Sequence, residues 1–175
     1  ALLVAEDGEQ IWVAEGTYRP SGANKDSRSA TFSVEKKVGI YGGFVGTETS
    51  VEQADPLTNL TVLSGDLNDD DPVDFSDNAY SVVTFSTNGV GEGTLLHGFV
   101  ITAGNADYED DANPAQYTGG GILFDGTTNG LLVERCEIRG NQAISGGGVA
   151  NTDSFDRGTF MSCRFNRNTA ASMGG

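Results

Sequence analysis

The segment Cys136-Glu-Ile-Arg-Gly-Asn141 returns 27 residues later as Cys163-Arg-Phe-Asn-Arg-Asn168 (163 − 136 = 27). The same offset carries Gly147-Gly148 onto Gly174-Gly175. A fixed period of this length is typical of stacked repeats, in which each repeat buries its apolar side only against its neighbours. The repeat therefore predicts the architecture of the chain more directly than its function.

Short β-prone runs alternate with clusters of Gly, Asn and Asp along the chain. Runs of three to eight residues that are interrupted by turn residues predict strands. A coil with three short strands and three turns needs about 27 residues, so the period favours an all-β chain folded as a parallel β-helix, or β-solenoid. The predicted strands cover residues 11–14, 31–34, 38–41, 60–63, 81–85, 94–101, 121–124, 131–133, 136–138, 148–150, 159–161 and 163–165.

Superposing the last two repeats predicts how neighbouring coils contact each other. Apolar side chains fall on apolar ones in three pairs: Ile138 with Phe165, Val133 with Phe160, and Ala143 with Ala170. Glu137 falls on Arg164, an opposite-charge pair on the outer face. Asn141 falls on Asn168, which predicts an Asn ladder at a turn, where the side-chain amides can satisfy neighbouring carbonyls.

The preceding repeat contains Phe99-Val-Ile-Thr-Ala-Gly-Asn105, which matches the same element with one extra residue and aligns Asn105 with Asn141. Their separation is 141 − 105 = 36, so this coil carries 36 − 27 = 9 additional residues. We place these in the acidic, aromatic loop 107–117, because insertions in stacked repeats gather on one face, often the binding face. We expect one domain over 1–175, a section of a longer solenoid, with less regular coils over 1–95 and regular repeats over 96–175.

The composition narrows the class of protein. The 25 glycines and only 4 prolines among 175 residues indicate many tight turns in a folded chain. Ten basic and 25 acidic residues give a net charge of −15, which repels nucleic acid and anionic membranes and argues against both as partners. No run of 18 apolar residues occurs, so we expect no membrane insertion of this segment.

Three N-terminal segments carry a family resemblance: Ile11-Trp-Val-Ala-Glu-Gly-Thr-Tyr18, Ile40-Tyr-Gly-Gly-Phe44 and Val62-Leu-Ser-Gly-Asp66. They resemble the N-terminal region of bacterial right-handed parallel β-helix surface proteins with the pectate-lyase-like fold. Gly147-Gly-Val149 and Phe165-Asn-Arg-Asn168 are similar to the repeats of chlamydial polymorphic outer-membrane proteins. The resemblance covers nearly the whole chain and implies a right-handed solenoid that is secreted or lies on the bacterial outer surface.

The acidic segment Asp66-Leu-Asn-Asp-Asp-Asp71, followed by Asp74 and Asp77, predicts a Ca²⁺ site. Calcium takes six to eight oxygen ligands, and the alternate positions Asp66, Asn68 and Asp70 can project theirs together. The segment lacks the Gly at the sixth position and the Glu at the twelfth that an EF-hand loop requires. A solvated acidic loop is therefore the alternative, and residues 107–111 form a second, poorer candidate.

Asn151-Thr-Asp153, followed by Asp156, resembles a motif of polygalacturonase-type glycoside hydrolases, which share this fold. Glycoside hydrolysis normally needs two carboxylates at a controlled separation. The next repeat offers Asn168-Thr-Ala-Ala171, which has none, so we interpret the motif as an ordinary strand exit and expect no catalytic residue. The only histidine, His97, is expected to be a satisfied core or turn side chain.

A polysaccharide lyase would combine Ca²⁺ with an Arg or Lys base. The sequence places none of its C-terminal arginines beside either acidic loop: Arg135, Arg139, Arg157, Arg164 and Arg167.

Cys136 and Cys163 occupy the same slot of adjacent coils. Their separation falls in the Cα range of a disulfide, but side chains stacked in parallel orient poorly for one. Buried thiols in a core ladder are therefore favoured over a disulfide.

Three functions remain open. The favoured one is a non-catalytic, exported cell-surface or extracellular protein that acts in adhesion, matrix or filament assembly, because the repeat leaves no complete catalytic set. The alternatives are a carbohydrate-active enzyme (lyase or hydrolase) and a carbohydrate- or Ca²⁺-binding module, for which Tyr108 and Tyr117 are loop aromatics. The expected partners are a second copy, through end-to-end or lateral assembly, or a surface polysaccharide. Ca²⁺ is the only cofactor that the sequence indicates.

Overall fold

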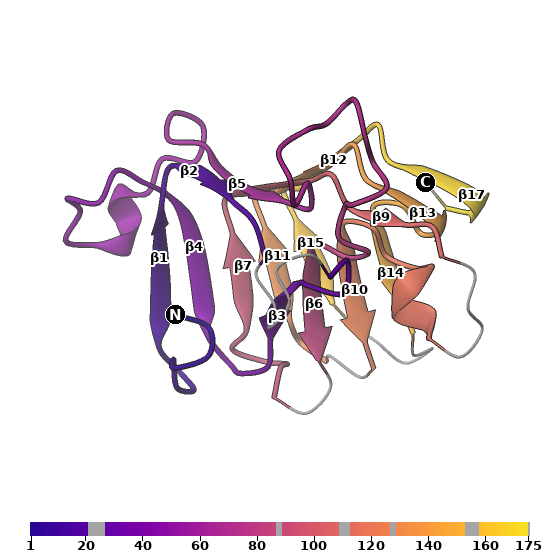
Figure 1. Cartoon of the computed structure of the whole chain (residues 1–175). Helices are drawn as coiled ribbons and strands as arrows, with labels where there is room; N and C mark the ends of the chain where they lie inside the picture. The colour runs from indigo at the N-terminus through magenta and orange to yellow at the C-terminus, as the bar shows by residue number, and fades with distance from the viewer. Residues whose placement is uncertain (21–26, 87–88, 109–112, 127–128, 153–157, 175) are drawn as a thin grey trace.

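Short strands that pair in parallel make up most of the secondary structure of this computed structural model, which describes residues 1–20, 27–86, 89–108, 113–126, 129–152 and 158–174 (Figure 1). Two single-turn 3₁₀ helices, η1 (Val51–Gln53) and η2 (Pro114–Gln116), are the helical elements of these ranges. Neither is long and apolar enough to cross a membrane. The chain is therefore all-β, as predicted.

The strands form four parallel sheets, which we call A to D. Sheet A has the order β1 (Gln10–Ala14), β4 (Gly39–Phe44), β7 (Leu95–His97), β11 (Leu132–Glu134), β15 (Thr159–Met161). Sheet B has the order β16 (Arg164–Asn166), β12 (Glu137–Arg139), β8 (Phe99–Thr102), β5 (Thr61–Ser64), β2 (Gly16–Tyr18). Sheet C has the order β14 (Val149–Asn151), β10 (Ile122–Asp125), β6 (Val83–Ser86), β3 (Phe32–Val34), and sheet D the order β17 (Thr169–Met173), β13 (Gln142–Ser145), β9 (Asn105–Ala106).

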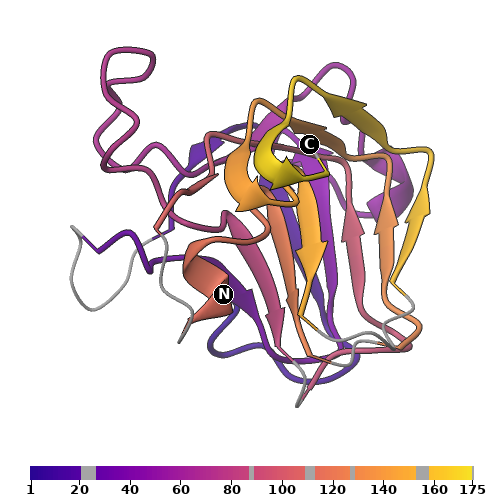
Figure 2. The ribbon, with the colours of Figure 1, turned by 90° about the vertical axis from the view of Figure 1, so that its right-hand side faces the viewer.

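The chain visits the sheets in a fixed rotation, A, B, then D where present, then C, and we call one such passage a circuit. Each circuit lays its strands beside those of the previous one, and Figure 2 views the resulting stack end-on. The register of sheet A gives circuit lengths of 39 − 10 = 29, 95 − 39 = 56, 132 − 95 = 37 and 159 − 132 = 27 residues. The 27-residue offset is thus the true register of the last two circuits, and the earlier ones are longer.

The predicted coil was wrong in its number of strands for the later circuits. The first two circuits have the three strands predicted, whereas the later circuits gain a fourth, because the segments 105–106, 142–145 and 169–173 pair in sheet D. The predicted strand 94–101 also divides into β7 and β8 at Gly98, whose φ of 78° is one that glycine adopts without strain. The strands of sheet D consist mainly of polar and small residues, so their sequences do not show a strand pattern. The corner at Gly98 lies inside an apolar run, so the sequence does not show the division into two strands.

The predicted alignment of Asn105 with Asn141 was also wrong. Asn105 pairs with Gln142, and the Gly104 amide donates to Asn141 Oδ1 at 3.0 Å. The offset is therefore 142 − 105 = 37, which gives 37 − 27 = 10 additional residues, located between β9 and β10 as expected for loop 107–117. No residue is inserted before this point, because Ala103 and Gly140 take the same corner position, each with φ 63°.

The predicted contacts between the last two circuits are confirmed. Ile138 pairs with Phe165, and Glu137 pairs with Arg164 with their charged atoms 3.9 Å apart. Asn141, which is fully buried, donates from Nδ2 to Asn168 Oδ1 at 3.0 Å and to the Ile101 carbonyl at 3.1 Å. The amide ladder thus satisfies carbonyls in the circuits on both sides.

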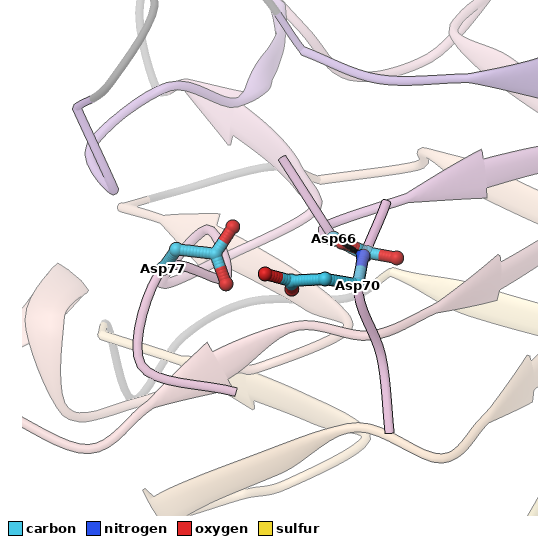
Figure 3. Close-up of side chains that lie close together, drawn as sticks. All are labelled: Asp66, Asp70 and Asp77. Atoms are coloured by element: carbon cyan, nitrogen blue, oxygen red, sulfur yellow. Dashed lines mark hydrogen bonds between the residues drawn. The ribbon is translucent and has the colours of Figure 1, made fainter. Parts of the chain in front are cut away.

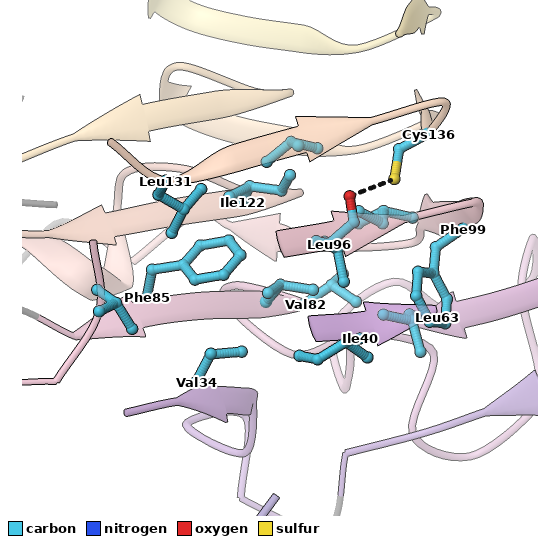
Figure 4. Close-up of a cluster of buried hydrophobic side chains, with 14 of the residues drawn as sticks. Val34, Ile40, Leu63, Val82, Phe85, Leu96, Phe99, Ile122, Leu131 and Cys136 are labelled. Atoms are coloured by element: carbon cyan, nitrogen blue, oxygen red, sulfur yellow. Dashed lines mark hydrogen bonds between the residues drawn. The ribbon is translucent and has the colours of Figure 1, made fainter. Parts of the chain in front are cut away.

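The hydrophobic core fills the inside of the circuits (Figure 4). Phe85 stacks on Phe124 with ring centroids 5.4 Å apart, and Phe160 meets Phe124 edge-on at 6.0 Å. Each such side chain contributes about 1.5–3 kcal/mol on burial. Gly120 is one of several glycines where neighbouring circuits approach closely, because a Cβ there would clash with the Gln142 carbonyl oxygen.

Candidate functional site

Three segments of neighbouring circuits lie on one side of the stack: residues 19–20 and 27–31 after β2, 65–82 after β5, and 103–108 and 113–121 after β8. We call this side the loop face. The second segment contains the acidic loop 66–77, which stands away from the body of the stack in Figure 2, and the third contains Asp107, the first residue of the other acidic segment. Asn105 joins the two loops, because its Nδ2 donates to the Phe75 carbonyl at 2.9 Å. Equivalent positions in the circuits thus bring together segments about 40 residues apart in sequence.

Arg28 ties the three segments of the loop face together. Its Nε donates to the Asn78 carbonyl at 2.7 Å, and its Nη2 donates to the Asn105 carbonyl at 2.5 Å and to Asp107 Oδ1 at 2.6 Å. Its guanidinium carbon lies 4.3 Å from the centre of the Tyr80 ring. This arginine therefore fixes the spacing of the two acidic loops.

Asp66, Asp70 and Asp77 form a cluster that we call the acidic triad. Each offers a carboxylate oxygen, and these oxygens all lie within 4.8 Å of one another. Figure 3 shows the carboxylates of Asp70 and Asp77 pointing toward each other. Asp66 is 7% exposed, whereas Asp70 is open to solvent, so the triad runs from the side of the stack outward.

Backbone amides hold two members of the triad in place. Asp66 Oδ1 accepts from the amides of Asp69 at 2.7 Å and Asp70 at 3.2 Å. Asp77 Oδ2 accepts from the Asn68 amide at 3.0 Å, which closes the loop. Asp77 Oδ1 is buried without a hydrogen-bond partner among the described residues. An acceptor that is already desolvated and unpartnered is available to a cation.

The triad concentrates uncompensated negative charge. Partial desolvation, reinforced by the charges of Asp77, Asp74 and Asp66, raises the pKa of the Asp70 carboxyl above its usual value. The pKa of Asp71 is also raised, chiefly by desolvation. Asp74 behaves oppositely, because its hydrogen bonds with Ser76 lower its pKa.

The geometry of the triad fits a calcium ion. Calcium–oxygen distances are about 2.3–2.6 Å, so two oxygens on one ion lie at most about 5 Å apart. The 4.8 Å limit within the triad meets this condition. Of the predicted ligands, Asp66 and Asp70 come together, while Asn68 contributes its amide to Asp77. Asp77, which the sequence placed in the same acidic segment but not among the three predicted ligands, joins the cluster because the loop folds back on itself.

Two arginines from the first circuit lie beside the acidic loops, which the sequence analysis missed. Arg19 donates from Nε to the Asp66 carbonyl at 2.6 Å and pairs through Nη2 with Asp69. Arg28 pairs with Asp107 of the other loop. The sequence analysis considered only the C-terminal arginines and therefore did not identify these two contacts. The only sequence signal was that Arg19 and Arg28 follow a predicted strand, as both loops do.

The other sequence candidates lie away from the triad. Asn151 ends β14 and is exposed, and Asp153 and Asp156 are outside the described residues. His97 lies on β7 in sheet A, where burial lowers its pKa. Its Nδ1 is buried without a hydrogen-bond partner in the described part of the chain, so the prediction of a satisfied histidine was wrong.

Among the grooves that the described residues line, two are relevant to catalysis. One of about 540 Å³ opens at the N-terminal end of the stack and is lined mainly by apolar side chains with Arg19 as its charged group. The other, of about 370 Å³, has Glu9 as its single carboxylate. Neither groove contains the pair of carboxylates that glycoside hydrolysis requires.

Comparison with protein-family models, with curated proteins and with solved structures finds no match for this chain. Its function must therefore be argued from its own residues.

Proposed function

We propose that this chain forms a right-handed parallel β-helix, and that it serves as a non-catalytic, exported cell-surface protein. In this proposal the loop face binds Ca²⁺ and mediates adhesion to a surface polysaccharide or to a second copy. The observation that carries the proposal is the acidic triad, held by backbone amides on the side of a regular stack.

The parallel pairing in all four sheets supports the β-helix. Strands follow one another through the sheets in a constant order, and each circuit pairs with the previous one. Connections between parallel strands of one sheet are right-handed in about 98% of proteins, which supports the hand. The resemblance of the segments 11–18, 40–44 and 62–66 to β-helix surface proteins points the same way.

The charge of the loop face supports a calcium-dependent contact. Segment 66–77 contains six aspartates, and Arg19 pairs with one of them, Asp69. A divalent cation lowers the repulsion among these carboxylates, and its remaining coordination positions can take oxygens from another molecule. Carboxylated polysaccharides offer such oxygens, as does the acidic loop of a second copy. An exported protein would meet enough Ca²⁺ for a weak site to fill.

A polysaccharide lyase is the second candidate, and Arg19 is the observation that favours it. Arg19 lies beside the acidic triad, as the base of a calcium-dependent lyase would. Both of its described polar contacts, however, are to the loop itself, which supports a structural role. Incubation with polyuronates and Ca²⁺, followed by the ultraviolet absorbance of unsaturated products, distinguishes the candidates. The non-catalytic proposal predicts no product.

Adhesion is tested by displaying the chain on a non-adherent bacterial strain. Retention on surfaces coated with acidic or neutral polysaccharide, and aggregation between cells, are measured in Ca²⁺ and in a chelator. We expect retention or aggregation in Ca²⁺, its loss in the chelator, and its loss in Asp77→Asn. Asp74→Asn is the matched control, because Asp74 lies in the same loop but outside the triad. Cells that remain non-adherent in Ca²⁺ would refute the adhesive function.

A further inference from the structure

Two consecutive residues at the end of the acidic loop bury oxygens that lack a partner. Asp77 Oδ1 and Asn78 Oδ1 are both buried and accept no hydrogen bond in the part of the chain that the structure describes. Asn78 as a whole is 1% exposed, so its amide oxygen is shielded from bulk water. An unpaired buried acceptor is costly, and a bound ion is one of the explanations that such a group calls for.

The side-chain amide of Asn78 points into the acidic cluster. Its Nδ2 donates to the Asp71 carboxylate, at 3.2 Å from Oδ2 and 3.5 Å from Oδ1. Turning the amide round would bring its oxygen against that carboxylate, so the nitrogen faces Asp71 and the oxygen is left unpaired. Asp71 follows Asp70 of the triad, and Asn78 follows Asp77. The amide contact therefore lies next to the carboxylates of the triad in the folded loop.

An amide oxygen suits the ion that fits the triad. Calcium takes six to eight oxygens, and the amide oxygen of Asn is among its usual ligands. The triad supplies three side chains, which leaves coordination positions open to a further oxygen of the protein. The hydrogen bond to Asp71 holds the Asn78 amide in one orientation, as outer partners do for metal ligands.

We propose that Asn78 Oδ1 is a further ligand of the cation held by the acidic triad, and that Asp71 is the positioning residue that orients the amide. This inference rests on the proposed function, because it adds a ligand to the same calcium site. It also changes the amide that was predicted from the sequence. Asn68 is exposed and contributes its backbone N–H to Asp77, whereas the buried side chain of Asn78 supplies the oxygen.

Europium(III) is the probe for this ligand. It is an oxygen-seeking ion close to Ca²⁺ in size, and its luminescence lifetimes in H₂O and D₂O count the waters bound to it. Asn78→Ala should bind Eu³⁺ with about one more water than the parent, because water takes the vacated position. Its affinity for Ca²⁺, measured by competition, should fall by roughly tenfold or more. Asn68→Ala is the matched control, because it removes an exposed amide from the same loop, and its water count should equal that of the parent.

Asn78→Asp separates a ligand from a purely structural residue. This substitution keeps an oxygen at the position but removes the N–H that donates to Asp71. A ligand role predicts the same number of bound waters as in the parent and an affinity for Ca²⁺ that is not weaker. In chelator the variant should melt at a lower temperature than the parent, because it buries an uncompensated charge, and Ca²⁺ should reverse the difference. Weaker binding by Asn78→Asp would overturn the proposal, and this test stands even if Asn78→Ala fails to fold.

Failure of this inference is distinguishable from failure of the proposed function. A parent chain that binds neither Eu³⁺ nor Ca²⁺ would overturn both. A parent chain that binds, with an equal number of bound waters in Asn78→Ala, would overturn the assignment of Asn78 alone. The triad would then be the whole set of side-chain ligands, and a buried water would satisfy the amide oxygen.

Discussion

At the scale of single residues, the amide of Asn141 contributes most to the contact between circuits. Its Oδ1 accepts from the Gly104 amide, and its Nδ2 donates to the Ile101 carbonyl, so one side chain satisfies two backbone groups of the preceding circuit. Unpaired backbone groups are costly where water is excluded. Asn141 therefore does at a corner what strand pairing does along the sheets.

Replacing Asn141 with alanine should destabilise the chain by roughly 2–6 kcal/mol, because two buried backbone groups lose their partner at about 1–3 kcal/mol each. Chemical denaturation followed by circular dichroism measures the change. Asn113→Ala is the control, because Asn113 is exposed and makes no side-chain capping bond to η2. It should change stability by less than about 0.5 kcal/mol. Equal stability of the two variants would contradict the role of the ladder.

The sequence predicted this ladder for Asn141 and Asn168, whose repeats match residue for residue. The prediction failed for Asn105, because the neighbouring Gly104 takes the ladder position in that circuit. The backbone conformation at the corner decides which residue of this circuit lies opposite Asn141. The two adjacent candidates are Gly104 and Asn105. Residue identity alone could not distinguish them.

At the scale of strands and loops, β12 illustrates how the sheets are held. Ile138 is fully buried and lies between Ile101 of β8 and Phe165 of β16. Ile138→Ala should cost about 2–5 kcal/mol of stability, because a cavity is left between circuits that cannot collapse independently. Leu57→Ala is the matched control, since Leu57 is 91% exposed. If Ile138→Ala unfolds at the same denaturant concentration as the parent, this register is wrong.

In the loop 66–77, by contrast, we expect a substitution that stabilises the chain. The raised pKa of Asp70 means that its charge opposes folding, a penalty that is absent below its ordinary value of 3.8 and grows as pH rises through the raised pKa. In chelator at neutral pH, Asp70→Asn should therefore melt at a higher temperature than the parent, and the difference should shrink on acidification.

Thermal denaturation from neutral to acidic pH tests this prediction, with Asp74→Asn as the control. The pKa of Asp74 is lowered, so its charge supports folding and its loss should lower the melting temperature at neutral pH. Calcium should raise the melting temperature of the parent but not that of Asp70→Asn. A lower melting temperature for Asp70→Asn in chelator would contradict the account of the triad.

Most strands could be predicted because their apolar runs are bounded by glycine and asparagine. Sheet D could not, because segments such as Gln142–Ser145 carry few apolar residues and become strands only by pairing with neighbouring circuits. The acidic loop was also predictable as a candidate metal site. Its partners Arg19 and Arg28 were not, since they come from a circuit about 50 residues earlier in the sequence.

At the scale of the whole molecule, charge is distributed unevenly along the stack. Residues 1–134 carry 22 acidic and 5 basic side chains, a net of −17, whereas residues 135–175 carry 3 acidic and 5 basic, a net of +2. The acidic triad lies in the negative part and is the densest cluster of carboxylates that the described residues form. The molecule therefore carries this carboxylate cluster within the acidic part of the stack, which is the basis of the adhesive proposal.

Calorimetric titration of the purified chain with Ca²⁺ tests the central claim most directly. We expect one site per chain with a dissociation constant on the order of 10⁻⁴ to 10⁻³ M, as in extracellular calcium modules. Binding should be lost in Asp77→Asn and kept in Asp74→Asn. Absence of binding in this range, or equal binding by the parent and Asp77→Asn, would contradict the account.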